Sequence, residues 1–225
     1  MSAKEQTKNR VAIAGRVIDA ETKLAIAGAL VEVSQKQGKF KNWLDLHALQ
    51  YAKSWEKMVK RPDRTLTAID GWFYFVDLPD ADECYTLTVS RPSAGTRYGV
   101  ANSETIKVVY FNNDRITWTP IGLPPTAIKG RITDSKNCPI FMAKVQVAGS
   151  SESAFSDKDG DYFLHGLEVC KPQQKKTITI KVYARGYEEV SQSVEISQGQ
   201  ILEPINLSLQ ANNLTNLATS KINTS

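Results

Sequence analysis

Apolar and polar residues alternate with a period of two along most of the chain, the pattern of half-buried β-strands. In the first half, the alternating segments are residues 10–18, 28–34, 65–69, 71–77, 85–90, 104–111 and 115–119. In the second half, they are residues 126–133, 142–149, 153–156, 161–164, 176–184, 188–196 and 201–209. Short strands with regular turn signals, in two successive blocks, predict two antiparallel β-sandwiches.

The two blocks repeat one another. The segment that begins Gly15-Arg16-Val17 returns 115 positions later as Gly130-Arg131-Ile132. The segment that begins Asp70-Gly71 returns only 89 positions later, as Asp159-Gly160. The first copy therefore holds about 25 extra residues before its Asp-Gly turn. Two copies of one β-domain, one of them with an insertion, favour a scaffold for binding over an enzyme.

The extra residues change the period from that of a strand to that of a helix. The apolar positions fall on one stripe and are Leu44, Ala48, Tyr51, Trp55 and Met58 or Val59. This spacing predicts a helix from about Asn42 to Lys60. Asn42 is its expected cap, and Pro62 is expected to stop it.

These patterns divide the chain into parts. Residues 10–120 form a first domain with the insertion at 35–64, and residues 126–209 form a second domain. Between them, residues 121–125 include Gly122 and a Pro-Pro pair, which predicts a short, stiff linker. Residues 210–225 are rich in Asn, Thr and Ser without periodicity, and we expect a disordered tail.

Charge is concentrated in the insertion. The chain of 225 residues has a net charge of +4, whereas residues 35–64 alone hold eight Lys or Arg against three Asp or Glu. The remainder is about neutral, so the insertion is the part suited to an acidic partner surface. No stretch approaches the roughly 20 apolar residues of a membrane helix. The polar start lacks a signal-peptide core, so we expect the cytoplasm unless a dedicated machine exports the protein.

The order of these motifs resembles the carboxypeptidase regulatory-like domain. The hairpin signature of that family matches Thr67 to Leu78, and its following strand matches Tyr85 to Val89. The second copy offers Ser156 to Leu167 and Ile178 to Tyr183. The resemblance implies an all-β fold of two tandem seven-stranded Greek-key prealbumin-like β-sandwiches, the first with an α-helical insertion. Domains of this family are usually non-catalytic accessories, and a fold does not fix a function.

The first copy has a narrower resemblance. The segments Arg61 to Thr65, Tyr85 to Val89 and Gly95 to Gly99, with the helical insertion, are similar to a subgroup encoded with phage-tail-like contractile injection systems. This resemblance implies a structural or accessory component of such an assembly. Its partners would be protein subunits of the assembly, with multiple copies per particle, no nucleic acid and no direct membrane insertion.

Candidate catalytic and metal-binding groups are sparse. His47 and His165 are the two histidines, and neither has the spacing of a metal motif. The three cysteines, Cys84, Cys138 and Cys170, lack a CxxC pair and are expected to be reduced thiols. No nucleophile elbow or phosphate loop is present. We therefore expect no enzyme activity, no cofactor and no metal; a small hydrolase would need both histidines to converge on a nucleophile.

The segment from Asp157 to Asp161 superficially resembles a calcium loop. Its glycine follows the second acid instead of the third, and no glutamate ends a twelve-residue loop. The first copy has Ile69-Asp70-Gly71-Trp72 at the same place and lacks two of the three acids. A hairpin turn explains both sequences.

The insertion is the best candidate for function. Its candidate partner-interface residues are Trp43, Lys53, Trp55, Lys57, Lys60, Arg61 and Arg64. Large aromatic side chains and arginine dominate protein interfaces. Two interpretations stay open: the apolar stripe covers its own sandwich, or it contacts a partner. Nucleic-acid binding is a third option, but no RNA- or DNA-binding motif is present.

We therefore expect a non-catalytic structural or accessory component of a contractile, phage-tail-like injection assembly that acts through protein–protein contacts. The alternative is a stand-alone β-sandwich module that binds carbohydrate or another ligand. Such modules usually expose a planar aromatic platform. Trp72 and Trp118 lie in predicted strands, where the sequence does not determine which way they face.

Overall fold

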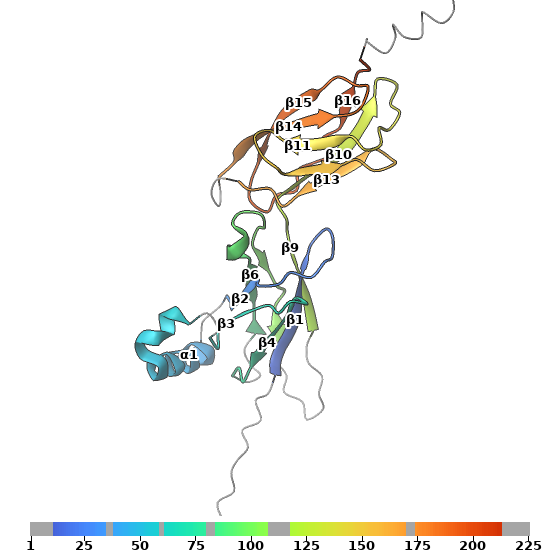
Figure 1. The fold of residues 1–225 in the computed structure, drawn as a ribbon. Helices are drawn as coiled ribbons and strands as arrows, with labels where there is room; N and C mark the ends of the chain where they lie inside the picture. The colour runs from blue at the N-terminus through green and yellow to red at the C-terminus, as the bar shows by residue number, and fades with distance from the viewer. Residues whose placement is uncertain are drawn as a thin grey trace, which may run out of the picture. The chain divides into compact units, whose positions relative to one another are not determined.

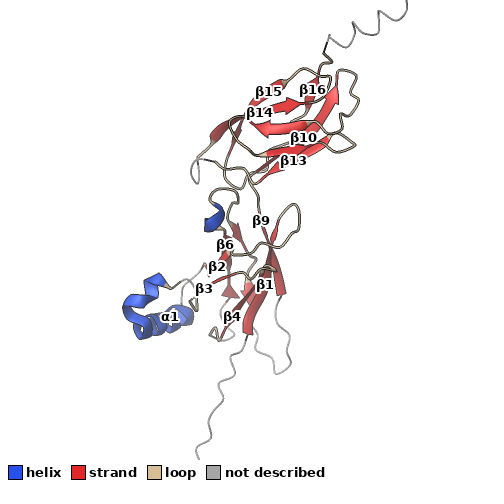
Figure 2. Ribbon diagram, viewed as in Figure 1, coloured by secondary structure: helices blue, strands red, loops and turns tan. Residues whose placement is uncertain are grey.

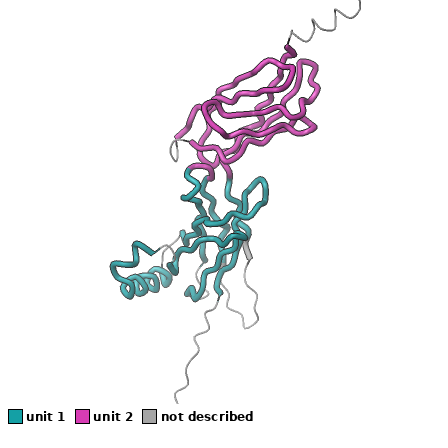
Figure 3. The backbone as a smooth tube through the Cα atoms, viewed as in Figure 1, with its two compact units in different colours: residues 1–95, 99–124 teal, residues 96–98, 125–225 magenta. Residues whose placement is uncertain are grey.

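A computed structural model describes residues 11–34, 38–58, 61–79, 84–107, 118–169 and 174–212. The chain forms two compact units (Figure 3). Unit 1 comprises residues 1–95 and 99–124, and unit 2 comprises residues 96–98 and 125–225. Strands make up most of the regular structure in both units, and the helical insertion belongs to unit 1 (Figure 2). The predicted all-β fold with a helical insertion is confirmed.

Unit 1 contains two main sheets (Figure 1). The first has the order β4-β1-β9, and its strands are β4 (Trp72–Val76), β1 (Val11–Asp19) and β9 (Trp118–Leu123). The second has the order β3-β2-β6-β7, with β3 (Arg64–Leu66), β2 (Leu30–Val33), β6 (Leu87–Ser90) and β7 (Ala101–Asn102). A short pair joins β5 (Cys84–Tyr85) to β8 (Ile106–Lys107).

The core of unit 1 follows the two-residue period of its strands. Alternate residues of β4 and β6 are buried, and Tyr85 of β5 is buried as well. The side chains that fill this core include Ile13, Val17, Val31, Val33, Phe73, Phe75, Leu87 and Val89. Burial of such side chains is the main favourable term in folding and is worth about 1.5–3 kcal/mol for each.

Unit 2 has the same arrangement of two sheets. One has the order β13-β10-β16, with β13 (Asp161–His165), β10 (Ala127–Asp134) and β16 (Leu207–Leu209). The other has the order β12-β11-β14-β15, with β12 (Ser153–Phe155), β11 (Lys144–Val147), β14 (Lys176–Tyr183) and β15 (Val190–Ile196). In each unit the first strand pairs in parallel with the last one, β1 with β9 and β10 with β16.

The Asp-Gly turn differs from its prediction. In both units the strands on either side of it belong to different sheets, so the turn is a corner between sheets and not a β-hairpin. The physical reason is the approach of the neighbouring strand. Gly71 has φ +80°, and a Cβ there would lie 2.5 Å from the carbonyl oxygen of Val17. Gly160 repeats this geometry against Ile132, with the same φ and the same distance.

The insertion also differs from its prediction. Helix α1 spans Gly38–Tyr51, and the 3₁₀ helix η1 spans Ala52–Lys57. Asn42 therefore lies inside α1 and is not its cap. Ala52 has φ +46°, a left-handed conformation that cannot continue an α-helix, so α1 ends at Tyr51, although the rings of Tyr51 and Trp55 still stack at 6.2 Å. A second 3₁₀ helix, η2 (Pro92–Ala94), follows β6.

The predicted linker and tail begin inside regular structure. Strand β9 continues to Leu123, and Ile121 and Leu123 are buried, so the first three residues of segment 121–125 belong to unit 1 as a strand. The start of segment 210–225 is also paired, because Glu188 N donates to Gln210 O at 2.8 Å. The rest of the predicted tail, 213–225, lies outside the described residues, as does 108–117 of the predicted strand pair. None of the described helices is long and apolar enough to span a membrane.

Candidate protein-docking surface

Helix α1 is fixed to unit 1 at its beginning. Phe40 is 1% exposed and Leu44 is also buried. The ring of Phe40 meets the buried ring of Tyr85 edge-on, with 5.4 Å between centroids. Trp43 stacks on Phe40 at 5.7 Å. These contacts place part of the apolar stripe against its own sandwich, and Phe40, which the helical spacing missed, is its deepest member.

Arg61 holds the other end of the insertion through a bidentate ion pair. Its Nε donates to Oδ1 of Asp63 at 2.9 Å and its Nη2 donates to Oδ2 at 3.0 Å. Asp63 is fully buried, and its carbonyl oxygen accepts a hydrogen bond from Val33 N of β2. The guanidinium of Arg61 also lies over the ring of Trp55, 5.0 Å from its centroid. Arg61 and Trp55, both predicted as interface residues, are engaged with each other inside unit 1.

Arg64 has a similar internal role. Its Nη2 donates to the carbonyl oxygens of Met58 and Glu56, at the end of η1. Its Nε is buried and has no hydrogen-bond partner among the described residues. Arg64 therefore closes the insertion onto β3 instead of standing free at its edge.

The remaining predicted residues divide into three groups. Lys53 and Lys57 are exposed. Trp43 is half-buried and faces a groove, described below. Lys60 lies outside the described residues. The structure thus separates two exposed lysines from two arginines that hold the insertion in place.

Two leucines that the sequence analysis did not select are the most exposed large apolar side chains among the described residues of the insertion. Leu46 is 67% exposed and Leu49 is 77% exposed. They stand three positions apart in α1 and so share one helix face, and Lys53 and Lys57 are exposed in η1, beyond the break at Ala52. We call Leu46, Leu49, Lys53 and Lys57 the outer face. The sequence contained a signal for the outer face, because two of its leucines do not belong to the apolar stripe of Leu44 and Ala48.

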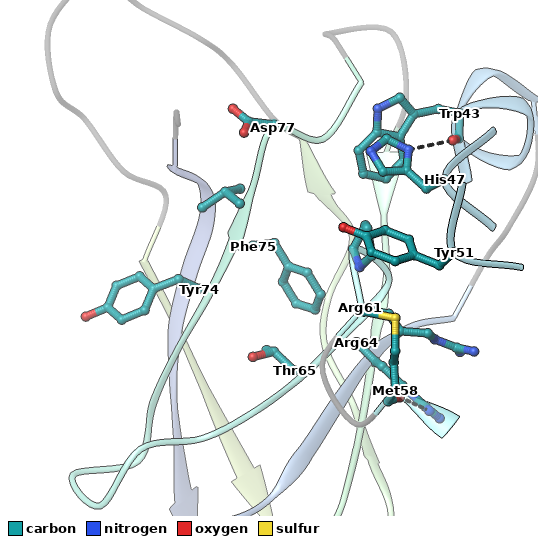
Figure 4. A pocket seen from close by; sticks show the side chains of 12 residues that line it. Trp43, His47, Tyr51, Met58, Arg61, Arg64, Thr65, Tyr74, Phe75 and Asp77 are labelled. Atoms are coloured by element: carbon teal, nitrogen blue, oxygen red, sulfur yellow. Dashed lines mark hydrogen bonds between the residues drawn. The ribbon is translucent and has the colours of Figure 1, made fainter. Parts of the chain in front are cut away.

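A groove of about 340 Å³ opens between the insertion and the strands of unit 1 (Figure 4). Trp43, His47 and Tyr51 of α1 line one wall, and Figure 4 shows Phe75 of β4 pointing toward them. Its other lining residues are Met58, Arg61, Pro62, Arg64, Thr65, Tyr74, Val76 and Asp77. The ring of His47 lies tilted against that of Trp43, with 4.3 Å between centroids, and its Nδ1 donates to the carbonyl oxygen of Trp43 at 2.9 Å. This bond fixes which ring nitrogen carries the proton in the neutral imidazole.

The other chemical candidates have structural surroundings. His165 is the last residue of β13, one position beyond the predicted strand 161–164; it is exposed and stacks on Phe163 at 5.4 Å. The carboxylate of Asp157 accepts hydrogen bonds from the backbone N–H groups of Asp159 and Asp161, both at 2.9 Å, and so holds the turn. Within the described ranges, no three His, Cys, Asp or Glu side chains form a group that could hold a metal ion.

The described cysteines are free thiols. Cys84 begins β5 and Cys138 lies in the turn after β10, and both are exposed. Cys170 lies outside the described residues.

Comparison with known proteins finds a family model that matches most of the second unit. The model of the carboxypeptidase regulatory-like domain matches residues 127–210, from the start of β10 to just after β16. The predicted resemblance is therefore confirmed for this part of the chain. No curated protein matches the chain.

Several solved structures are similar to the whole chain at low identity. The shaft pilin SpaA of Lactobacillus rhamnosus GG has a TM-score of 0.40 and 10% identity, over 92% of this chain and 99% of that one. The minor pilin GBS52 of Streptococcus agalactiae has a TM-score of 0.29 and 11% identity, over 89% and 96%. A streptococcal ancillary pilin has a TM-score of 0.30 and 13% identity, over 92% and 64%. TM-scores this low carry no argument about the function of this chain.

Proposed function

We propose that this protein is a non-catalytic structural subunit that docks onto other proteins through the outer face of its insertion. The observation that carries the proposal is the pair Leu46 and Leu49, 67% and 77% exposed on an insertion that Phe40 and Arg61 fix at its two ends. Burial of two leucines in a partner is worth about 3–6 kcal/mol. The adjacent Lys53 and Lys57 suit an acidic rim on the partner protein, because opposite charges speed and orient the encounter of two proteins.

The assembly we propose is a contractile, phage-tail-like injection particle, in which the protein is present in several copies and acts from the cytoplasm. The support is the resemblance of segments Arg61 to Thr65, Tyr85 to Val89 and Gly95 to Gly99 to that subgroup. We further propose that residues 10–120 are a second copy of the regulatory-like domain that residues 127–210 match. The equal strand orders of the two units support this second proposal.

Density-gradient sedimentation of particles from the source cells tests the proposed function. The wild-type chain is expected in the fast fractions together with sheath and tube subunits. A variant with Leu46→Ser, Leu49→Ser, Lys53→Glu and Lys57→Glu is expected to remain in the slow fractions. These four side chains are exposed, so its melting temperature should stay within a few degrees of the wild type.

A matched control changes an exposed apolar side chain and a lysine of unit 2, Phe141→Ser with Lys136→Glu. This control should co-sediment like the wild type. The proposal is wrong if the wild-type chain sediments only as free protein, or if the outer-face variant stays with the particles.

The alternative function, carbohydrate binding, has one observation in its favour. Trp72 and Tyr74 lie on the same side of β4, with their ring planes 9° apart and their centroids 6.3 Å apart, and Tyr74 is half-exposed. Nearly parallel aromatic rings can stack on the flat faces of sugar rings. Affinity electrophoresis in gels that contain soluble polysaccharides tests it: retardation that Tyr74→Ala removes would favour this function. The side chain of Trp118 lies outside what the structure describes.

A further inference from the structure

The groove lies on the side of unit 1 where two edge strands meet. Strand β3 ends one sheet and β4 ends the other, and residues of both line the groove. The insertion supplies the opposite wall with Trp43, His47 and Tyr51. In unit 2, the equivalent strands β12 and β13 also end their sheets, but no helix stands beside them in the described residues. The groove is therefore a product of the insertion.

The backbone of β4 presents unpaired hydrogen-bonding groups to this groove. Val17 N donates to Gly71 O, and β1 pairs with β4 in antiparallel register, so Gly71, Phe73 and Phe75 point their N–H and C=O groups toward β1. Trp72 and Tyr74, which lie between these residues, point their N–H and C=O groups away from β1. Trp72 O accepts a hydrogen bond from Ala68 N, and beyond Trp72 no strand of the described residues lies on the edge of β4 away from β1, where Tyr74 and Val76 stand. Both of these residues line the groove.

The opposite wall matches the period of an extended chain. Trp43, His47 and Tyr51 are spaced by four residues along α1, which is about 6 Å of helix rise between neighbours. Side chains on one face of a strand repeat about every 6.6–6.8 Å. An extended peptide beside β4 can thus place every second side chain against one ring of α1 after another. Phe75 of β4 faces these rings across the groove (Figure 4).

The charge around the groove selects the chemistry of such a peptide. Arg64 lines the groove and bonds to backbone carbonyls instead of a carboxylate, while Lys57 is exposed in η1 and Lys53 is exposed one turn earlier. Asp77 is an acid at the other end of β4. The end of the groove near η1 is therefore positive and suits an acidic side chain.

We propose that the groove binds an extended peptide of a partner protein as an additional strand on β4. Every second side chain of the peptide is apolar and enters the groove, and an acidic residue lies at the end of the peptide near Arg64. Its backbone bonds to the N–H and C=O groups of Tyr74 and Val76, the recognition mode of strand addition. The inference extends the proposed docking function with a second contact, separate from the outer face.

A peptide-display selection against the full-length chain provides the probe. Peptides enriched from a random library are synthesised with a fluorophore, and their binding is measured by anisotropy. We expect alternating apolar residues with an acidic flank. Binding of the selected peptides should protect the amides of Tyr74 and Val76 from hydrogen exchange in the wild-type chain. A ligand held by side chains alone would leave those two amides unprotected.

Two variants separate the backbone contact from a general loss of structure. Val76→Pro removes a backbone N–H at the end of β4, beside the register shift in the pairing of β4 with β1, and should weaken binding about tenfold or more, because it deletes one main-chain hydrogen bond and opposes the added strand. The matched control is His165→Pro at the equivalent position of β13, 89 residues later, which should leave peptide binding unchanged. Tyr51→Ala should also weaken binding, since it removes part of the ring wall.

Three results would overturn the inference: no peptide is enriched, enriched peptides bind the Val76→Pro variant as well as the wild type, or the Tyr74 and Val76 amides gain no protection. The hydrogen-exchange measurement uses the wild-type chain, so it tests the proposed strand addition even if the Val76→Pro variant fails to fold. Particle association is read separately by sedimentation. A chain that binds peptides at β4 yet never joins particles would refute the proposed function and leave this inference standing.

Discussion

Thr67 and Ser156 occupy equivalent positions in the two units and make the same pair of hydrogen bonds. Each buried hydroxyl donates to one backbone carbonyl and accepts from the backbone N–H three residues further on. The partners of Thr67 are Ile26 O at 2.7 Å and Ala29 N at 2.9 Å; those of Ser156 are Ile140 O at 2.6 Å and Ala143 N at 2.9 Å. Both hydroxyls fix the segment just before the second strand of their unit.

We expect Thr67→Val to destabilise unit 1 by about 1–3 kcal/mol, because it keeps the volume but leaves a buried N–H and a buried C=O unpaired. Thr67→Ser keeps the hydroxyl and should cost clearly less. Urea unfolding followed by the fluorescence of the tryptophans, all four in unit 1, measures the difference. Equal stability of the valine and serine variants would mean that the bonds contribute nothing.

Gly71 is predicted to tolerate no side chain. A Cβ there would lie 2.5 Å from a backbone oxygen at a φ of +80°, so Gly71→Ala should cost about 2–5 kcal/mol. Gly28 is the matched control, since its φ is +66° but nothing lies within 4 Å of a Cβ. Gly28→Ala should therefore cost about 1–2 kcal/mol, the conformational part alone. Thermal unfolding of both variants separates the close approach from the backbone strain.

These residues also show what the sequence could and could not predict. The strands, the repeat and the insertion follow from the period of apolar residues, which reports which face of an element is buried. The Asp-Gly turn was predicted as a hairpin because turn residues do not report whether the next strand joins the same sheet or the other one. Gly71 decides this through its contact with Val17, a residue far away in sequence.

The candidate site was also predictable only in part, because some of its residues are held by contacts that the sequence does not report. Lys53 and Lys57 are exposed as their charge implies, but Arg61 and Arg64 are held by Asp63 and by carbonyls of η1, contacts that composition cannot reveal. No glycine or proline lies at the helix break at Ala52, so the sequence does not predict the break. The groove wall is formed by Trp43, His47 and Tyr51, a row that lies beside the predicted stripe of Leu44 and Ala48, so that stripe did not describe the groove.

The Arg61–Asp63 pair should be essential to the insertion. Asp63→Ala leaves a guanidinium that is 13% exposed without its carboxylate, and loss of one partner of a buried pair costs about 3–5 kcal/mol. Lys41 and Asp45 form the matched exposed pair, 3.1 Å apart and 60% exposed on both sides. Asp45→Ala should cost about 0.5 kcal/mol or less. Chemical denaturation of both variants contradicts this account if the two costs are alike.

Unit 2 should lose stability in alkali through Tyr162. Burial raises the pKa of its hydroxyl from 10.0 to about 12, and this hydroxyl donates to Ile205 O at 2.9 Å. Because the folded state keeps the proton more tightly than the unfolded state, the contribution is complete below pH 10 and is lost as the pH rises toward 12. Tyr162→Phe should flatten this dependence. The check is unfolding as a function of pH with tyrosinate absorbance; an unchanged slope in the variant would disprove the assignment.

Site-specific photo-crosslinking tests the proposed docking face most directly. A photoreactive amino acid replaces Leu49 on the outer face in one protein and Phe141 of unit 2 in another, and both proteins are irradiated within purified particles. The account predicts that position 49 crosslinks to one defined subunit of the particle and that position 141 does not. Crosslinks from position 141 alone, or none from position 49 in particles that contain the protein, would contradict the proposal that the insertion is the docking surface.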